Sequence, residues 1–373
     1  QSEVSRVISG ATSGTTGRAK RVFYTEADTA HTVGFFAAGI SEMLHPGEKC
    51  FIAFPFTGPF GLGDLIAKAV EGLGGIPIRA GFGQTWSELC NLVHETKPET
   101  YIGFPVTLLG LARMYGEEFP IKRALVSGDA CPEGVMEELK KTLELYPHYG
   151  SRECGLGGAV TCPAFEGMHL RENHIIPEII DETGNVLPDG AYGELVITTI
   201  GSDAMPLIRY RTGDYTRLLP PCPCGGISRR IDAVSRREGS ISIEALDSTL
   251  FHHPGLIDYR ASFNGGLTIE ARVLEPGAEA QLYRAAPMQA NLLALCGITH
   301  GTHLDRIVRQ GEVLQQEVTR GIGRRADRRM EQHHRSIGDM LAGLRINHIT
   351  KDMGIGRFSV PLCHSQANSQ KKH

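Results

Sequence analysis

One segment near the start of the sequence has residues suited to binding phosphate. Between Ser9 and Lys20 the chain holds three glycines and five serine or threonine residues. Glycine permits unusual backbone dihedrals and keeps side chains out of the way, so backbone N–H groups can turn toward phosphate oxygens. On composition alone, a flexible polar loop is an equally good interpretation. The residues expected to contact phosphate are Ser13, Gly14, Thr15, Thr16, Gly17 and Lys20.

A second group of residues could hold a metal ion. Cys162 and His169, together with Cys222 and Cys224 of a Cys-Pro-Cys-Gly-Gly segment, supply three thiolates and one imidazole. This set is complete for tetrahedral Zn²⁺ and leaves no open position, so we expect a structural zinc site. The spacing is not that of a zinc finger. Buried thiols beside a strand histidine are the alternative, with Cys154 as a rival ligand.

Three further motifs follow the glycine-rich loop along the chain. Ser127–Ala130 reads Ser-Gly-Asp-Ala, Tyr149–Glu153 reads Tyr-Gly-Ser-Arg-Glu, and Ala204–Asp214 reads Ala-Met-Pro-Leu-Ile-Arg-Tyr-Arg-Thr-Gly-Asp. A glutamate suits Mg²⁺, which binds one or two carboxylates plus substrate phosphates. Taken singly, the first motif is also a generic turn and the last a charged β turn.

Together these motifs resemble, in the right order, those of the adenylate-forming enzymes. Thr12–Gly17 is similar to the phosphate-binding signature, Ser127–Ala130 to the adenine-contacting turn and Tyr149–Glu153 to the Tyr-Gly-x-Thr-Glu motif. Ala204–Asp214 resembles the phenylacetate–coenzyme A ligase branch, which also has similar cysteine and histidine elements. The loop is not a Walker loop, because Gly-Lys-Ser/Thr is missing. The resemblance spans roughly Val7–Ile231.

The resemblance implies a role for each motif. Asp214 would accept hydrogen bonds from both ribose hydroxyls, and Glu153 would hold Mg²⁺. Lys20, Glu153 and Arg211 would act as catalytic residues, whereas Arg152 replaces a small hydroxyl residue or threonine of the family and could alter phosphate contacts. The adenine would be held by Ser127, Gly128, Asp129, Ala130, Tyr149 and Gly150, with the tyrosine ring stacked on the base.

The reaction implied by the resemblance is attack of a carboxylate on the α-phosphate of ATP, with pyrophosphate leaving. Two anions must meet, so catalysis is mostly positioning and charge neutralisation, and no side-chain nucleophile is needed. The small domain would then rotate and coenzyme A would take the acyl group. The expected partners are an aryl or arylacetic acid, ATP, Mg²⁺ and coenzyme A. Transfer to an amine or a carrier protein, and a degenerate scaffold that binds a partner through a basic helix, stay open.

The elements that must position these residues are those of an α/β fold. Short β-type runs alternate with helical runs, which predicts a layered α/β domain with a largely parallel sheet, because parallel strands need crossover connections. The expected strands are Cys50–Phe54, Ile76–Arg79, Tyr101–Phe104 and Arg123–Ser127, and the expected helices are Asp64–Gly72, Trp86–Thr96, Val106–Tyr115 and Pro132–Leu145.

The pattern changes after His169. Strands expected at His174–Asp181 and Glu194–Thr199 are separated by turn-rich segments, which predicts an antiparallel β subdomain at about 160–230. A polar stretch near Arg236 marks the end of a large domain, 1–238. A smaller mixed α/β domain, 239–373, would follow, with a long arginine-rich helix at Leu304–Leu344.

Composition excludes several classes of protein. Apolar residues make up 41% and charged residues 21% of the chain, as in soluble globular proteins. No apolar run is long enough for a membrane span, and nine thinly spread cysteines suit reduced thiols, so we expect a cytoplasmic location. Residues 303–373 carry 13 basic against 7 acidic residues, but the acidic ones are interleaved, which disfavours nucleic-acid binding. The sequence leaves the oligomeric state open, a homodimer included.

Two parts of the chain depart from the family pattern. Family members carry a helical segment before the phosphate loop, whereas only eight residues precede Ser9, so we expect that segment to be missing. The hinge between the domains has Asp232, Arg236 or Arg237 as candidates, in no certain register. The catalytic lysine expected near the C-terminus is matched by Lys351 in a glycine-containing segment.

Overall fold

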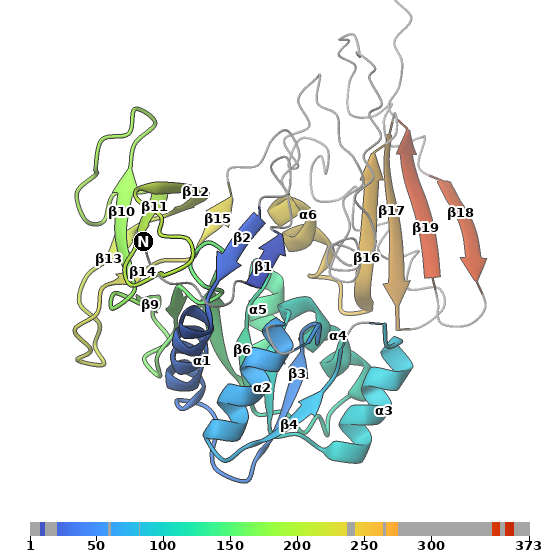
Figure 1. Cartoon of the computed structure of the whole chain (residues 1–373). Coiled ribbons are helices and arrows are strands. Elements are labelled where there is room, and N and C mark those ends of the chain that lie inside the picture. Colours follow the sequence, from blue (N-terminus) through green and yellow to red (C-terminus); the bar gives the residue numbers. More distant parts are fainter. Residues whose placement is uncertain are drawn as a thin grey trace, which may run out of the picture. The chain divides into compact units, whose positions relative to one another are not determined.

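The computed structural model describes residues 8–11, 21–58, 61–81, 83–236, 243–263, 266–274, 345–350 and 355–361, and the statements below concern these residues. The chain divides into two compact units, Gln1–Arg237 and Glu238–His373. Each unit is described by itself (Figure 1).

The helices of the first unit begin at recognisable caps. Thr25 accepts a hydrogen bond from Asp28 N at 3.0 Å while the Asp28 carboxylate accepts from Thr25 N at 2.7 Å, which is a capping box. Thr85 and Glu88 form the same arrangement, and Pro105 lies in the first helical turn of α4. The helices are α1 (Glu26–Ile40), α2 (Leu62–Gly72), α3 (Trp86–Thr96), α4 (Pro105–Tyr115) and α5 (Glu133–Leu139).

A nine-stranded sheet forms the centre of the first unit. Its order is β13-β14-β9-β8-β7-β6-β5-β3-β4, parallel from β4 to β7 and antiparallel from β7 to β13. This confirms the predicted α/β class with a largely parallel sheet in the first part of the chain. Its strands are β3 (Lys49–Ala53), β4 (Ile76–Arg79), β5 (Thr100–Gly103), β6 (Arg123–Val126), β7 (Glu144–Tyr149), β8 (Ala159–Val160), β9 (Met168–Leu170), β13 (Leu218–Leu219) and β14 (Arg230–Ile231).

The direction of the chain along this sheet reverses once in its parallel half. It runs from β3 to β4 one way, and from β4 through β5 and β6 to β7 the other way. Right-handed crossovers therefore put α2 on one face and α3, α4 and α5 on the other. The packing agrees, since α1 contacts α2 and α4 contacts both α3 and α5 (Figure 1). Ligands bind such sheets outside the carboxyl ends of the strands near the reversal, here between β3 and β5.

Two smaller antiparallel sheets complete the described part of the first unit. One has the order β10-β11-β12-β15, as predicted antiparallel, and the other pairs β1 with β2. The glycine-rich loop of the sequence connects β1 to β2. These strands are β10 (Ile175–Ile180), β11 (Gly193–Thr199), β12 (Tyr210–Thr216), β15 (Ser235–Arg236), β1 (Ile8–Ala11) and β2 (Arg21–Tyr24).

The helix predicted at Pro132–Leu145 is wrong in its second half. The helix α5 ends at Leu139, and the chain continues as strand β7, parallel to β6. Leu145, Tyr146 and His148 are buried in the sheet, so tertiary packing overrides the local helical pattern. Pro147 could not donate the next helical hydrogen bond. Strand β7 ends at Tyr149 and so places the Tyr-Gly motif at the carboxyl edge of the sheet.

The second unit contains one helix and an antiparallel sheet of order β16-β17-β19-β18 among its described residues. The buried hydroxyl of Tyr259 donates to Asp247 of the helix. The arginine-rich segment Leu304–Leu344 lies outside the described residues. The elements are α6 (Ile243–Leu250), β16 (Leu256–Phe263), β17 (Gly266–Val273), β18 (Arg345–Thr350) and β19 (Ile355–Pro361).

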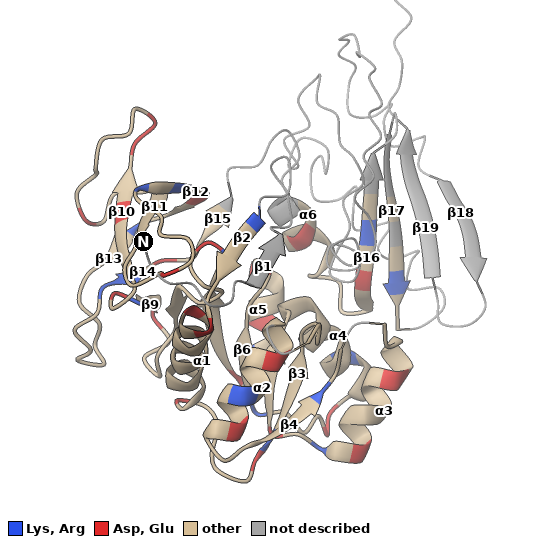
Figure 2. Ribbon diagram, in the orientation of Figure 1, with Lys and Arg blue, Asp and Glu red and all other residues tan. Residues whose placement is uncertain are grey.

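Charged residues in the described part of the first unit are spread over the outer helices. Figure 2 shows both signs of charge on α2 and acidic residues near both ends of α3. Among the described residues, no helix has the length and apolar character to cross a membrane.

Candidate active site

The carboxyl ends of four parallel strands bring residues from distant parts of the sequence to one edge of the sheet. Phe54 follows β3, Phe104 follows β5, Ser127 follows β6 and Tyr149 ends β7. The rings of Phe54 and Phe104 meet edge to face, with centroids 5.0 Å apart, at the point where the chain reverses direction. This is the edge at which an α/β sheet binds its ligand.

The turn after β6 passes close over the two phenylalanine rings. Gly128 has a φ of +84°, and a Cβ there would lie 2.7 Å from Phe104 and 3.0 Å from Phe54, so glycine is required on both counts. Gly128, Asp129 and Ala130 are exposed. Their backbone is therefore accessible at the edge where the sequence predicted an adenine contact.

A buried hydrogen bond connects this turn to β7. The Ser127 Oγ and His148 Nδ1 atoms are 2.7 Å apart, and the imidazole stacks on Phe36 with ring centroids 5.2 Å apart. Burial lowers the pKa of His148 to about 3. The ring is therefore neutral at pH 7 and can accept or donate toward Ser127 according to its tautomer.

Tyr149 and Asp214 form a direct hydrogen bond. The phenol of Tyr149 donates to Asp214 Oδ2 at 2.8 Å, and the carboxylate is buried. Burial, and next the negative charge of Asp214, raise the pKa of the Tyr149 phenol well above its ordinary value. Asp214 lies on β12, which pairs with β11 and β15. The bond joins the Tyr-Gly motif to the motif that ends in Asp214.

The loop that carries Glu153 is held from several sides. Tyr210 donates from its hydroxyl to Glu153 Oε1 at 2.8 Å. Tyr24 of β2 donates to Arg152 O at 2.5 Å, and Thr32 of α1 donates to Gly155 O at 2.7 Å. The carboxylate that the sequence assigned to Mg²⁺ thus has a defined position beside β2, the strand that leaves the glycine-rich loop.

Tyr210 was missed by the sequence analysis. On β12, Tyr210, Thr212 and Asp214 are less exposed than Arg211 and Gly213 between them. Side chains alternate along a strand, so Tyr210 shares a face with Asp214. That alternation was the available signal.

Arg211 has a different environment from the other predicted catalytic residues. Its Nε, at 2.9 Å, and its Nη2 both donate to Oε2 of the buried Glu194, whose Oε1 accepts from Gly213 N at 3.1 Å. Hydrogen bonding to Glu194 raises the pKa of Arg211. The structure pairs Arg211 with Glu194, not with Glu153 or Asp214.

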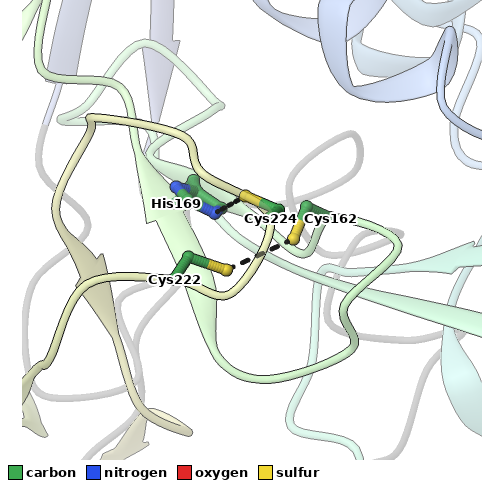
Figure 3. Close-up of side chains that lie close together, drawn as sticks. All are labelled: Cys162, His169, Cys222 and Cys224. Carbon is green, nitrogen blue, oxygen red and sulfur yellow. Dashed lines mark hydrogen bonds between the residues drawn. The ribbon is translucent and has the colours of Figure 1, made fainter.

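The predicted zinc ligands converge at one point. One ligand atom each from Cys162, His169, Cys222 and Cys224 lies within 4.8 Å of all the others (Figure 3). The sulfurs of Cys162 and Cys222 are 3.7 Å apart, and the Cys224 sulfur is 3.4 Å from His169 Nε2. A tetrahedral ion with Zn–S bonds of about 2.3 Å and Zn–N bonds of about 2.0 Å separates its ligand atoms by about 3.5–3.8 Å. The cluster therefore fits such an ion.

The surroundings of the cluster hold the ligands in place. His169 Nδ1 lies 3.0 Å from Ser228 Oγ, so the other ring nitrogen faces the thiols. Arg230 donates to the carbonyl oxygens of Pro220, at 2.7 Å, and Glu166, at 2.6 Å. The rival Cys154 instead donates its thiol to Ser151 O, and its side chain is not part of the cluster.

The remaining predicted site residues lie outside the described residues. They are Ser13, Gly14, Thr15, Thr16, Gly17, Lys20 and Lys351. Gly150 is described, and a Cβ there would lie 2.2 Å from Leu156 O, so a larger residue cannot occupy this position in the Tyr-Gly motif.

Comparison with protein families gives one match that covers more than half of the chain. The AMP-binding enzyme family model matches residues 11–202. Phenylacetate-coenzyme A ligase of Pseudomonas putida is 35% identical over 235 residues, which cover 59% of this chain and 52% of that protein. The enzyme of the same name from Thermus thermophilus is 31% identical over 262 residues, 65% of this chain and 56% of that protein. The chain spans about half the length of the curated relatives it matches.

Solved structures show the same fold. A 2-hydroxyisobutyryl-CoA ligase in the postadenylation state, with 2-HIB-AMP bound, aligns with a TM-score of 0.63 and 19% identity, over 79% of this chain and 68% of that one. The same ligase with 2-HIB-AMP and CoA in the thioesterification state aligns with a TM-score of 0.57 and 20% identity, over 85% and 76%.

Proposed function

The chain belongs to the AMP-binding enzyme family, in its phenylacetate–coenzyme A ligase-like branch, and from this we propose that it activates a carboxylic acid with ATP and passes the acyl group to coenzyme A. The observation that carries the proposal is the pair of hydrogen bonds from Tyr149 to Asp214 and from Tyr210 to Glu153. They hold Asp214 beside Tyr149 at the end of β7, and Glu153 of the following loop beside Tyr210 of β12. The relatives named phenylacetate-coenzyme A ligase support an aryl or arylacetic acid as the substrate.

The nucleotide would lie along the carboxyl edge of the sheet. The exposed backbone of Gly128–Ala130 and the ring of Tyr149 are the surfaces offered to adenine. Asp214 would accept the ribose hydroxyls, since an ionised carboxylate has two acceptor oxygens. The Tyr149 hydroxyl keeps that carboxylate in place and the ring beside it. The same bond therefore positions both the base and the sugar.

The phosphate end would lie toward Glu153. This carboxylate would hold Mg²⁺, which neutralises phosphate charge when bound. Tyr210 fixes Oε1 of Glu153 and so orients the carboxylate before the substrates arrive. Lys20 and Lys351 are proposed to neutralise charge during adenylation. Arg211 could join them only by leaving Glu194.

Attack of the acid on the α-phosphate forms one P–O bond and breaks the bond to pyrophosphate. The carboxylate itself is the nucleophile, so no protein base is required. The protein contributes orientation and charge neutralisation. In the second step, the thiol of coenzyme A attacks the acyl adenylate, so a thioester bond forms and AMP leaves.

Acid-dependent exchange of labelled pyrophosphate into ATP tests the first step, and product analysis with coenzyme A tests the second. We expect exchange with arylacetic or benzoic acids and a thioester when coenzyme A is added. Exchange without thioester formation, together with an amide or carrier-bound product, would contradict coenzyme A as the acyl acceptor. No exchange with any aryl, arylacetic or short aliphatic acid would contradict the adenylation itself.

We also propose that Cys162, His169, Cys222 and Cys224 bind Zn²⁺ as a structural ion. The separations of the ligand atoms support this, as does the bond from His169 to Ser228. Four protein ligands leave no position for a substrate, so the ion would stabilise the fold and take no part in the reaction. A reducing, cytoplasmic location would keep the thiols available.

A further inference from the structure

A cleft in the first unit includes Tyr24 and Glu153 of the candidate active site. It is lined by residues of β2, the start of α1, the Glu153 loop and the segment Thr199–Met205. Its cavity volume is about 40 Å³. Arg171 and His174 of one segment and His31 of α1 are among its lining residues.

Arg171 is the unusual group in this cleft. It is 6% exposed, and no carboxylate pairs with it in the described part of the chain. Its Nη1 makes one long hydrogen bond to Gly157 O at 3.4 Å, its Nε has no partner among the described residues, and its guanidinium lies 5.2 Å from the centroid of the Phe35 ring. A buried cation with so few partners is costly, and arginine has five N–H donors. Such a group calls for an anion.

Two histidine rings lie on the same side of the cleft. The rings of His31 and His174 are 4.4 Å apart. Burial, and next the charge of Arg171, lower the pKa of His174, so its imidazole is neutral at pH 7. His174 Nδ1 lies 3.4 Å from Ile200 O, so its N–H is directed at that carbonyl, and the exposed His31 is the imidazole that can donate to an anion.

The acidic residues in the cleft do not neutralise Arg171. Asp28 is already occupied, because it accepts from the backbone N–H groups of Thr25, Asp203 and Ala204 at 2.7, 2.9 and 3.2 Å. Glu153 accepts from Tyr210 and is the proposed Mg²⁺ ligand. An anion in the cleft would thus lie between the guanidinium and a metal-binding carboxylate.

We propose that Arg171 and His31, beside the ring of His174, form an oxyanion subsite for a phosphate group, filled by the terminal phosphate of released pyrophosphate. The choice of pyrophosphate rests on the proposed function, because adenylation is the reaction that would supply it beside Glu153. Arg171 binds the phosphate through charge-assisted hydrogen bonds, which are stronger than neutral ones. Inorganic phosphate is the other source of the same chemistry.

Calorimetric titration of the full chain with pyrophosphate, and separately with inorganic phosphate, tests the subsite. Arg171→Met keeps length and removes the charge, and we expect it to weaken pyrophosphate binding roughly tenfold or more. The control is Arg217→Met, which removes an arginine paired with Asp232 and should leave binding unchanged. Because Arg171 is buried without a carboxylate partner, its replacement by an apolar side chain should not lower the melting temperature.

His31→Asn is a second variant at an exposed position, so it tests the subsite even if Arg171→Met does not fold. We expect a loss of about threefold, the value of one neutral hydrogen bond. Equal pyrophosphate affinity in the unsubstituted chain, Arg171→Met and His31→Asn would overturn the subsite, as would no binding of either anion. If inorganic phosphate binds as tightly as pyrophosphate, the subsite stands, but the assignment of pyrophosphate as its ligand is wrong.

Acid-dependent exchange, measured on the same samples, separates this inference from the proposed function. If acid-dependent exchange proceeds but Arg171→Met binds pyrophosphate as tightly as the unsubstituted chain, the proposed function stands and the subsite is wrong. If Arg171→Met weakens pyrophosphate binding but the chain shows no exchange with any acid, the subsite stands and the proposed function is wrong.

Discussion

The first unit holds two clusters of polar side chains that are built in opposite ways. In the nucleotide cluster, defined as Tyr149, Glu153, Tyr210 and Asp214, two hydroxyls each donate one hydrogen bond to a carboxylate. In the metal cluster, defined as Cys162, His169, Cys222 and Cys224, the ligand atoms point at one another within 4.8 Å. In the function proposed above, the first cluster would orient acceptors toward a substrate, whereas the second would surround an ion completely.

We therefore expect changes in the nucleotide cluster to affect activity and changes in the metal cluster to affect stability. An ionised carboxylate has two acceptor oxygens with about four lone-pair sites, so one bond to a hydroxyl does not exhaust its acceptor capacity, and changes there should alter activity with little effect on folding. A closed four-ligand site has no capacity left, so changes there should alter metal content and stability with little direct effect on chemistry. The predictions below test that division.

Asp214→Ala should have the largest effect. It removes the acceptor for both ribose hydroxyls, each bond to a charged group being worth about 1.5–3 kcal/mol, so exchange activity should fall by roughly 100-fold or more. The variant should keep its metal content and melting temperature within a few degrees. Asp189→Ala, at an exposed turn position, is the control and should be fully active. Near-normal exchange in Asp214→Ala would remove Asp214 from the nucleotide site.

Cys222→Ser should affect the metal cluster alone. Elemental analysis of chain purified without chelator should find about one zinc per chain, and the substitution should remove most of it, because serine is a poor replacement for a thiolate ligand. The melting temperature should fall by several degrees, since metal binding contributes directly to folding stability. Cys90→Ser, a thiol outside the cluster, is the control. A Cys222→Ser protein that kept all its zinc would exclude Cys222 as a ligand.

The buried His148, at the sheet edge next to Tyr149, should lower the free energy of unfolding in acid. Its pKa is about 3 in the folded chain and about 6.5 in an unfolded one, so the unfolded state binds more protons between these values. Its contribution to stability is complete above about pH 6.5 and declines as the pH falls toward 3, by up to about 1.4 kcal/mol per pH unit.

Urea unfolding at several pH values, comparing the unsubstituted chain with His148→Gln, measures this contribution. Glutamine keeps a polar partner for Ser127 and does not titrate. The acid sensitivity of the metal cluster is shared by both proteins and cancels in the difference between them. The free-energy difference between the two should shrink below pH 6.5. Parallel curves from pH 7 to pH 4 would show that His148 is not buried in its neutral form.

Much of the fold follows from local sequence patterns, and the failures have physical causes. The strand Ile76–Arg79 and the helix Trp86–Thr96 were predicted with the bounds observed, because caps and apolar periodicity agree there. The predicted helix Pro132–Leu145 is correct only as far as Leu139, because residues 144–149 pair with β6 in the sheet. Such pairing depends on tertiary contacts that a local pattern does not contain.

The site shows the same division. Glu153 and Asp214 could be named from motifs, yet their hydrogen bonds to Tyr210 and Tyr149 depend on how β7 and β12 come together. The four candidate metal ligands could be grouped by their chemistry, since three thiolates and one imidazole suit one tetrahedral ion. Arg171 could not be found this way, because its importance comes from burial without a carboxylate partner.

Tyr210→Phe should have the smallest effect and is the sharpest test of how the nucleotide cluster works. The substitution removes one hydroxyl and leaves the aromatic ring, so Glu153 loses the donor at 2.8 Å but keeps its charge. If Tyr210 orients the carboxylate for Mg²⁺, the Mg²⁺ concentration for half-maximal exchange should rise about threefold to tenfold, while the rate at saturating Mg²⁺ should stay near normal. Tyr192→Phe, which removes an exposed hydroxyl bonded to Ser235, is the matched control and should not change the Mg²⁺ requirement. A fall in the saturated rate with an unchanged Mg²⁺ requirement would mean that Tyr210 acts on the substrate instead, and a lower melting temperature with neither change would reduce its role to packing.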